Sequence, residues 1–434
     1  MFRRHYRIPT PFWFLIVVAS VFTLWHIAPE SLRNYIEPTA LAANFIVNTT
    51  DDHNDGVCNA ADCSLREAIN AVNGGAGGDT ISFNIAGAGV RTINVTATGG
   101  FSITKAVTID GTTQPGFAGV PLIELNGVNA GANVTGINVN APNVTLKGLI
   151  INRFTNFGIN FDSFGGNSVQ GCYIGTNDAG TVASGNGAGG IRINVGGITI
   201  GGTTAAARNV ISGNGGVGIN VLGPTATIQN NFIGTDVTGT IAIANANAGI
   251  RLDAVSGCTI GGTTNGARNV ISGNIGDGVQ IADASTGNVV QGNFIGVSAA
   301  GTSALGNTGN SVGGVSISSS NNNTIGGTAA GAGNVLSGNS GGNAYGIQIS
   351  ASSGTMVQGN LIGLDVSGTV KIQNDAGGII ILGGSNNTIG GTATGARNVI
   401  SGNGGAGMII LSDMTQVQGN FVGTNQSGTA ALGN

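Results

Sequence analysis

The chain has 434 residues, of which 80 are glycine, and only 8% are charged. A domain of this length rarely has one hydrophobic core, whereas a stack of repeats escapes that limit. The net charge of −4 offers no basic stripe to neutralise phosphates, which excludes nucleic acid as a partner.

The N-terminal segment has the pattern of a targeting sequence. Three arginines among the first seven residues precede an apolar run over residues 12–28, and Ala40-Leu41-Ala42 offers a signal peptidase site. Residues 1–42 are therefore predicted to be a signal peptide. The alternative is an uncleaved membrane anchor, which would be the chain's only contact with a membrane. In both cases the rest of the chain leaves the cytoplasm.

Residues 43–78 are predicted to form an N-terminal cap. Cys58 and Cys63 lie close together in a turn-rich segment, which favours a disulfide in an oxidising compartment. Zinc bound with the help of His53 is the alternative, but a full ligand set is missing. We therefore expect no metal and no cofactor. The other two cysteines, Cys172 and Cys258, are predicted to be buried small apolar residues.

A short helix is expected directly after the second cysteine of the cap. Ser64 and Glu67 have the spacing of a capping box, and Asn73-Gly74-Gly75 gives a stop signal. The apolar residues between them fall on one helical face: Leu65, Ala68, Ile69 and Val72. Because a solenoid exposes its apolar interior at each end, we expect this helix to cover the first coil.

The cap also carries a family resemblance. Cys63-Ser-Leu-Arg-Glu-Ala-Ile69, with Asp51-Asp-His-Asn-Asp-Gly-Val-Cys58 before it and Asp79-Thr-Ile after it, resembles the CSLREA-domain proteins. These are bacterial exported right-handed β-helix proteins of the pectin-lyase-like superfamily. The similarity continues through Val107-Thr-Ile-Asp-Gly-Thr-Thr-Gln-Pro115 and the repeats to Asn434. It implies a mature start near Ala43 and a place in the bacterial envelope or outside it. It implies no reaction, because the family has no shared activity.

Residues 79–434 are built of repeats. Ile-Gly-Gly opens four copies of a block that recurs every 60–65 residues, at Ile200, Ile260, Ile325 and Ile389. Each block holds two units that begin with Gly-(Ile/Val/Met)-x-(apolar), and ten such units run from Gly136 to the one at Gly407. Each unit has three short runs that alternate apolar and polar residues, separated by Gly, Asn, Thr and Ser. This pattern predicts an all-β fold, a single-stranded right-handed parallel β-helix of ten coils.

Several repeated polar residues are expected to stabilise the stack of coils. Two asparagine positions recur at turns and are predicted to form amide ladders: Asn209, Asn269, Asn334, Asn398, and Asn231, Asn293, Asn360, Asn420. Arginines precede the first set at Arg208, Arg268 and Arg397, and Gly333 interrupts this series. Surface packing and turn bonding is their expected role.

A longer loop closes the second unit of each block. Asp236 and Asp365 in these loops suggest calcium, but Asn177, Ser298 and Asn425 occupy the matching positions without charge. We therefore expect plain turns.

The x residue of each Gly-(Ile/Val/Met)-x strand points outward, as does the residue two positions further on. On the middle coils these columns carry a polar set: Asp162, Arg192, Asn194, Asn220, Arg251, Asp253 and Gln280. Amides and an Arg/Asp pair favour a polysaccharide lying along or across the stack of coils. The alternative is an ordinary solvated strand face.

A polysaccharide lyase or glycoside hydrolase is the alternative function. The three histidines, His5, His26 and His53, all precede the coils, which excludes a Ser-His-Asp or Cys-His site on them. Hydrolysis needs two carboxyl groups about 6.5–9.5 Å apart in inverting enzymes, and aspartates on adjacent coils meet that spacing.

One basic and acidic grouping suits such chemistry: Lys147, Arg153 and Asp162. No residue is assigned as catalytic. The main prediction is a secreted or cell-surface protein with a structural or adhesive role that binds polysaccharide or another surface protein.

The last coils differ from the rest by an apolar outward patch: Ile380, Leu382, Ile409 and Leu411. Exposed apolar patches mark interaction sites. The repeat is still in phase at Asn434, so we expect a partner or further repeats to cover this end.

Overall fold

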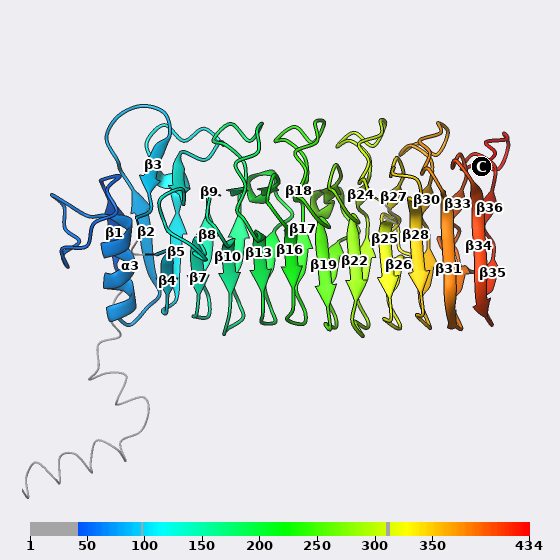
Figure 1. The fold of residues 1–434 in the computed structure, drawn as a ribbon, viewed down its shortest axis with the longest axis horizontal. Coiled ribbons are helices and arrows are strands. Elements are labelled where there is room, and N and C mark those ends of the chain that lie inside the picture. The colour runs from blue at the N-terminus through cyan, green and yellow to red at the C-terminus, as the bar shows by residue number, and fades with distance from the viewer. Residues whose placement is uncertain (1–41, 97–98, 310–312) are drawn as a thin grey trace, which may run out of the picture. The chain divides into compact units, whose positions relative to one another are not determined.

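The computed structural model describes residues 42–96, 99–309 and 313–434. From Asn44 to Asn434 these residues form one compact unit, in which the strands follow one another in chain order from β1 to β36 (Figure 1). They form three parallel sheets, named here sheets A, B and C. Each strand pairs with the corresponding strand of the next coil, so the predicted parallel β-helix is confirmed.

Sheet A has 13 strands in the described residues. They are β1 (Asn44–Val47), β2 (Asp79–Phe83), β5 (Val107–Asp110), β8 (Thr145–Lys147), β11 (Ser168–Gln170), β14 (Thr199–Gly201), β17 (Thr227–Gln229), β20 (Thr259–Gly261), β23 (Val289–Gln291), β26 (Thr324–Gly326), β29 (Met356–Gln358), β32 (Thr388–Gly390) and β35 (Gln416–Gln418).

Sheet B has 12 strands over the same ranges, most of them only two residues long. They are β3 (Arg91–Asn94), β6 (Ile123–Asn126), β9 (Leu149–Asn152), β12 (Tyr173–Ile174), β15 (Val210–Ile211), β18 (Phe232–Ile233), β21 (Val270–Ile271), β24 (Phe294–Ile295), β27 (Val335–Leu336), β30 (Leu361–Ile362), β33 (Val399–Ile400) and β36 (Phe421–Val422).

Sheet C has 11 described strands. They are β4 (Phe101–Ile103), β7 (Ile137–Val139), β10 (Phe157–Phe161), β13 (Gly189–Ile193), β16 (Val217–Val221), β19 (Ile250–Asp253), β22 (Val279–Ala282), β25 (Gly313–Ser318), β28 (Tyr345–Ser350), β31 (Gly377–Ser385) and β34 (Ala406–Asp413).

The stack begins earlier than the ten predicted coils. Strands β1 to β6 all precede the first Gly-(Ile/Val/Met)-x motif at Gly136, and β1, β3 and β4 among them were not predicted. They lack that motif, and the turns between them are irregular in length. The coil count was therefore too low.

The alternation of side chains fixes the core. In β13, Ile191 and Ile193 are buried while Arg192 is exposed. Isoleucine, valine and leucine from all three sheets fill the interior in this way. A second apolar cluster, which includes Tyr173, Phe232 and Phe294, lies apart from this core. All three rings come from sheet B strands.

Asparagine ladders close two of the turns. Asn209 donates to Asn231 at 2.8 Å, Asn231 donates to Asn269 at 3.0 Å, and the series continues in the same way to Asn420. This ladder was predicted. A second ladder, from Asn186 to Asn434, was not predicted, although it includes the last asparagine of Ser-Gly-Asn in each block, at Asn214, Asn274, Asn339 and Asn403.

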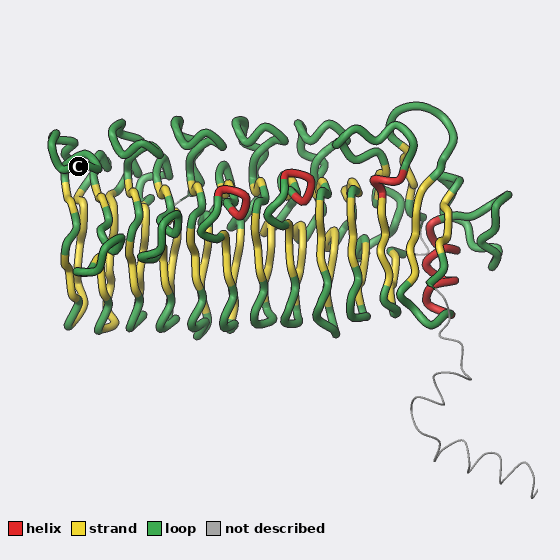
Figure 2. The backbone as a smooth tube through the Cα atoms, turned by 180° about the vertical axis from the view of Figure 1, so that it is seen from behind, coloured by secondary structure: helices red, strands yellow, loops and turns green. Residues whose placement is uncertain are grey.

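The N-terminal cap contains α3 (Leu65–Gly74), which lies at the β1 end of the stack (Figure 2). Ser64 and Glu67 form the predicted capping box, and the residues of the expected apolar face are buried. Cys58 and Cys63 form a disulfide, whereas Cys172 and Cys258 are free thiols and buried. Three single turns of 3-10 helix are η1 (Gly111–Thr113), η2 (Ala205–Ala207) and η3 (Asn265–Ala267).

The predicted leader over residues 1–42 lies, apart from Ala42, outside the described residues. In the part that the structure does describe, no helix is long and apolar enough to cross a bilayer.

Candidate functional site

The outward column of sheet C is continuous. The strand register pairs Asn160 with Arg192, Arg192 with Asn220, and Asn220 with Arg251, and Gln280 follows. Neighbouring strands of a sheet lie about 4.8 Å apart, so these side chains form one row across the coils. The structure thus brings the predicted polar residues onto one face.

The first part of this row is an amide network. Asn160 donates to Asn138 at 3.4 Å, and Asn194 donates to both Asn160 and Asp162 at 3.0 Å. Each amide keeps further hydrogen-bonding capacity, because an asparagine carries two donors and two acceptor sites. The network orients these groups while leaving capacity for a ligand.

A pocket of about 420 Å³ opens beside this network. Asn138, Asn160, Asn156 and Arg192 contribute polar groups to its lining, and Phe157 is also among the lining residues. Arg192 is exposed, and within the described ranges it makes no ion pair. The pocket therefore offers an uncommitted guanidinium next to amides, in a lining that is mainly polar.

In the second part of the row, neighbouring carboxylates neutralise the charge of the arginine. Arg251 lies 2.7 Å from the carboxylate of Asp253 and 3.7 Å from that of Asp283. Between the two arginines, the side-chain oxygen of Asn220 is buried and has no hydrogen-bond partner among the described residues. The acid pairing leaves Arg251 less able than Arg192 to bind an external anion.

The prediction that Lys147, Arg153 and Asp162 lie together is wrong. Lys147 belongs to sheet A and forms an ion pair with Asp110 at 3.0 Å. Arg153 follows sheet B and pairs with Glu124 at 3.2 Å, while Asp162 follows a strand of sheet C. Their closeness in sequence misled the prediction, because successive strands of one coil belong to different sheets.

A pocket outside the predicted columns lies along sheets A and B. It has a volume of about 330 Å³, and its lining includes Lys147, Tyr173, Arg208 and Phe117. Burial raises the pKa of Tyr173 and lowers that of Arg208. The sequence-based prediction considered only the outward columns of sheet C. The outward residues of sheet B, among them Tyr173 and Phe232, could have indicated this pocket and were not considered.

The cap holds a cluster that resembles a metal site. The ligand atoms of His53, Asp55 and Glu67 lie within 4.8 Å of one another, and His53 Nε2 is 3.4 Å from Glu67. Both Glu67 oxygens, however, already accept backbone N–H groups, those of Asp55 and Ser64. Hydrogen bonding in the helix cap accounts for this arrangement, and we assign it no metal.

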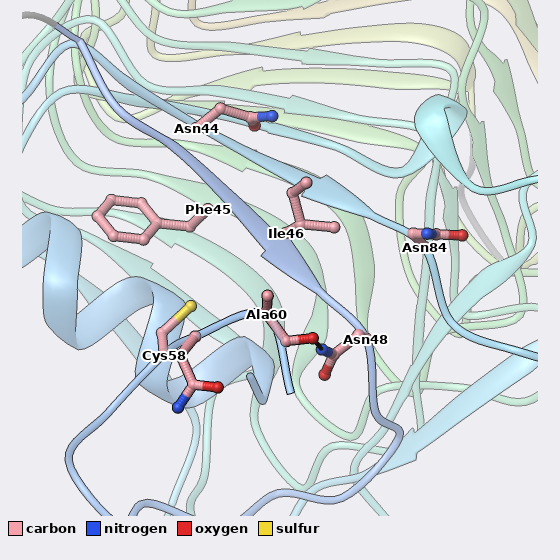
Figure 3. A pocket seen from close by; sticks show the side chains of 8 residues that line it. Asn44, Phe45, Ile46, Asn48, Cys58, Ala60 and Asn84 are labelled. Carbon is pink, nitrogen blue, oxygen red and sulfur yellow. Dashed lines mark hydrogen bonds between the residues drawn. The ribbon is translucent and has the colours of Figure 1, made fainter. Parts of the chain in front are cut away.

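Beside the cap, a pocket of about 380 Å³ lies against β1. Figure 3 shows Phe45 and Ile46 of this strand, with Cys58 and Ala60 from the disulfide loop across from them. Asn48 donates to the carbonyl of Ala60 at 3.1 Å, which ties the loop to the strand. None of the residues that line it has an ionisable side chain, because the sulfur of Cys58 is held in the disulfide.

The predicted apolar patch occupies the outer face of β31 and β34. Ile380 pairs with Ile409 and Leu382 with Leu411 in the register. Leu411 is 65% exposed and Leu382 is 39% exposed, whereas the two isoleucines are half-buried. A partner for this patch stays a prediction.

No family model and no curated protein matches the chain. Among solved structures, it is similar to the A-module of mannuronan C-5 epimerase AlgE4 from Azotobacter vinelandii. The identity is 11% over 82% of this chain and 92% of that module, with a TM-score of 0.42.

Two further solved structures show a similar degree of likeness. An alginate lyase from Paenibacillus sp. is 12% identical over 87% of this chain and 99% of its own, with a TM-score of 0.34. The pectate lyase Pel9A is 14% identical over 90% and 82% of the two chains, with a TM-score of 0.28. At these scores we take no function from the likeness.

Proposed function

We propose that this protein binds polysaccharide on the outer face of sheet C, in the pocket of Asn138, Asn160 and Arg192. The observation that carries the proposal is the combination of a guanidinium and several amides in one concave site, which Phe157 also lines. Amides exchange hydrogen bonds with hydroxyl groups, and a ring such as Phe157 packs on apolar C–H surface. A few polar groups in a pocket are what fixes a ligand's orientation.

Arg192 favours an acidic polysaccharide. A guanidinium binds a carboxylate through two parallel N–H···O bonds, which a neutral sugar cannot match. We further propose that the protein acts outside the cytoplasm, secreted or at the cell surface, in a structural or adhesive role. The targeting pattern at the N-terminus supports this placement.

The test compares a basic residue that lines the pocket with one that does not. Arg192→Ala is expected to weaken binding of an acidic oligosaccharide by about tenfold or more, because it removes a charge-assisted contact. Lys105→Ala removes one positive charge from an exposed residue that does not line the pocket, and we expect no change. Isothermal titration of both variants with uronate oligosaccharides measures the difference.

Arg251→Ala tests how far the binding site extends along sheet C. Since Asp253 and Asp283 already pair with Arg251, its loss is expected to matter less than that of Arg192. Equal affinity of Arg192→Ala and the unchanged protein would refute the proposal.

An enzyme acting on polysaccharide is the second candidate. The observation in its favour is the pocket that gathers Lys147, Tyr173 and Arg208, since cations neutralise a carboxylate and a phenol transfers protons. Screening acidic and neutral polysaccharides for shortened products distinguishes this function from binding alone. Activity lost in Tyr173→Phe would place catalysis in this pocket.

A further inference from the structure

The outer face of sheet B carries a repeated arginine–aromatic pair. Arg208 lies over the ring of Phe232 at 4.4 Å, Arg268 over Phe294 at 4.1 Å, and Arg397 over Phe421 at 3.9 Å. In each pair the arginine and the ring come from successive coils. The guanidinium gains a cation–π contact and the ring is shielded from water.

The ring position recurs on every second coil. The sheet B register runs from Phe232 through Val270 to Phe294, so consecutive rings are two strands, or about 10 Å, apart. The long loops also contact one another in series: the Ala299 N–H donates to Gly239, and the Gln426 N–H donates to Gly368. The arginine–aromatic pairs therefore belong to a regular structural column.

One pair is missing from this column, and both of its members are replaced. Where the next arginine would stand the chain has Gly333, and where the next ring would stand it has Leu361. A side chain at Gly333 would collide with the backbone carbonyl of Gly359. The distance between the flanking rings, Phe294 and Phe421, thus doubles to about 19 Å, or four strand spacings.

The missing pair leaves a pocket, named here the stacking gap, with a volume of about 380 Å³. Val335, Leu361 and Val399 line it with apolar surface, and Arg268 and Arg397 contribute positive charge. No aspartate or glutamate is among its lining residues. The stacking gap therefore combines an apolar surface with two cations that no lining acid neutralises.

The arginines keep hydrogen-bonding capacity. Arg397 uses its Nε to donate to the carbonyl of Gly419 at 3.0 Å, and its two terminal nitrogens make no hydrogen bond with the described residues. Arg268 donates through Nε to Gly292 and through one terminal nitrogen to Asn265. Three terminal nitrogens are thus available to an anionic ligand.

We propose that the stacking gap binds a carboxylate-bearing compound with a flat apolar face. The face would lie on Leu361 and its valine neighbours, in the space that a phenyl ring fills in other blocks. The carboxylate would take charge-assisted bonds from Arg397 or Arg268. An aromatic carboxylate and a uronate oligosaccharide share this chemistry. The site is independent of the proposed polysaccharide pocket, because it lies on sheet B rather than sheet C.

The experiment titrates the full protein with two carboxylate probes, 2-naphthoate and a uronate trisaccharide, and with 2-naphthamide as the neutral analogue. Arg397→Gln is expected to weaken carboxylate binding by about tenfold. Lys105→Gln is the control, because it removes one positive charge from an exposed residue that lines none of the pockets described above. Leu361→Phe restores the ring of the other blocks and is expected to abolish binding by filling the stacking gap.

Each outcome decides the proposal. Binding of either carboxylate, with loss in Arg397→Gln and Leu361→Phe but not in Lys105→Gln, supports it, and the tighter probe identifies the source of the ligand. No binding of either probe overturns it, as does equal weakening by Arg397→Gln and Lys105→Gln. Thermal unfolding of each variant, at a midpoint close to that of the unchanged protein, shows that lost binding is not lost folding.

Discussion

At the scale of single residues, the Asp236 side chain stabilises the turn of its long loop. Its carboxylate accepts the backbone N–H groups of Thr240 and Ile241 at 3.0 Å and the hydroxyl of Thr238 at 2.7 Å. Asn177 accepts the matching pair of N–H groups in its own loop. The aspartate thus closes a turn, as the sequence analysis expected. Burial alone would raise the pKa of Asp236, but these hydrogen bonds outweigh it and lower the pKa.

Replacing Asp236 tests this role. Asp236→Ala is expected to lower the free energy of unfolding by about 1–3 kcal/mol, because two N–H groups lose their acceptor. Asp236→Asn keeps the acceptor, as in the loop of Asn177, and is expected to cost less. Since the folded pKa is lowered, the stability from Asp236 is present above its unfolded pKa and lost as pH falls through the folded value.

Urea unfolding of the three proteins at pH 7 and at pH 3.5 measures these effects. The unchanged protein should lose more stability on acidification than Asp236→Asn does. An equal loss in both would contradict the assigned hydrogen bonds.

At the scale of elements, the helix α3 depends on its capping box. Ser64 accepts the N–H of Glu67, and Glu67 in return accepts the N–H of Ser64 at 3.0 Å. Burial alone would raise the pKa of Glu67, but the N–H groups of Ser64 and Asp55 lower it. The carboxylate also joins the helix to the loop that carries the disulfide.

Removing the cap hydroxyl should loosen this end of the stack. Ser64→Ala is expected to cost about 1 kcal/mol, and Ser64→Thr, which keeps a hydroxyl, less. Hydrogen exchange should then rise in α3 and leave distant strands such as β22 unchanged, because each coil contacts only its neighbours. A uniform rise along the chain would show that the cap acts on the whole stack.

At the scale of the whole molecule, asparagine ladders hold the coils in register. Asn269 is fully buried; it donates to Asn293 at 2.9 Å and to the carbonyl of Ile228 at 2.8 Å, and it also accepts from Asn231. Removing such a residue leaves several buried groups without partners. The stability of the stack therefore depends on buried asparagines that are outside the proposed binding sites.

Substitution within the ladder should weaken folding according to position. Asn269→Ala is expected to lower the free energy of unfolding by about 3 kcal/mol or more, since several buried hydrogen bonds are lost together. Asn420→Ala, at a partly buried rung, should cost less. Guanidinium unfolding followed by circular dichroism compares them. A larger loss at Asn420 would contradict this account of the ladder.

Much of the fold was predictable, because its signals are local and repeated. The alternation of Ile191, Arg192 and Ile193 predicts a strand with one buried face wherever it occurs. The early strands β1, β3 and β4 were missed because they lack the repeated motif. For the candidate site, the sequence predicted that Arg192, Asn220 and Arg251 point outward on one face. It did not show that Arg192 lines a pocket while Arg251 is paired with acids.

The sequence by itself thus determined the coil and its period, since turns and strands depend on residues a few positions apart. Only the tertiary structure decided which side chains meet. Strand register between successive coils brings Arg208 over the ring of Phe232. The same register brings Gly333 and Leu361 together at the interrupted position of the column. These contacts join residues more than twenty positions apart and depend on the direction of each side chain, so the stacking gap could be identified only after the coils were assembled.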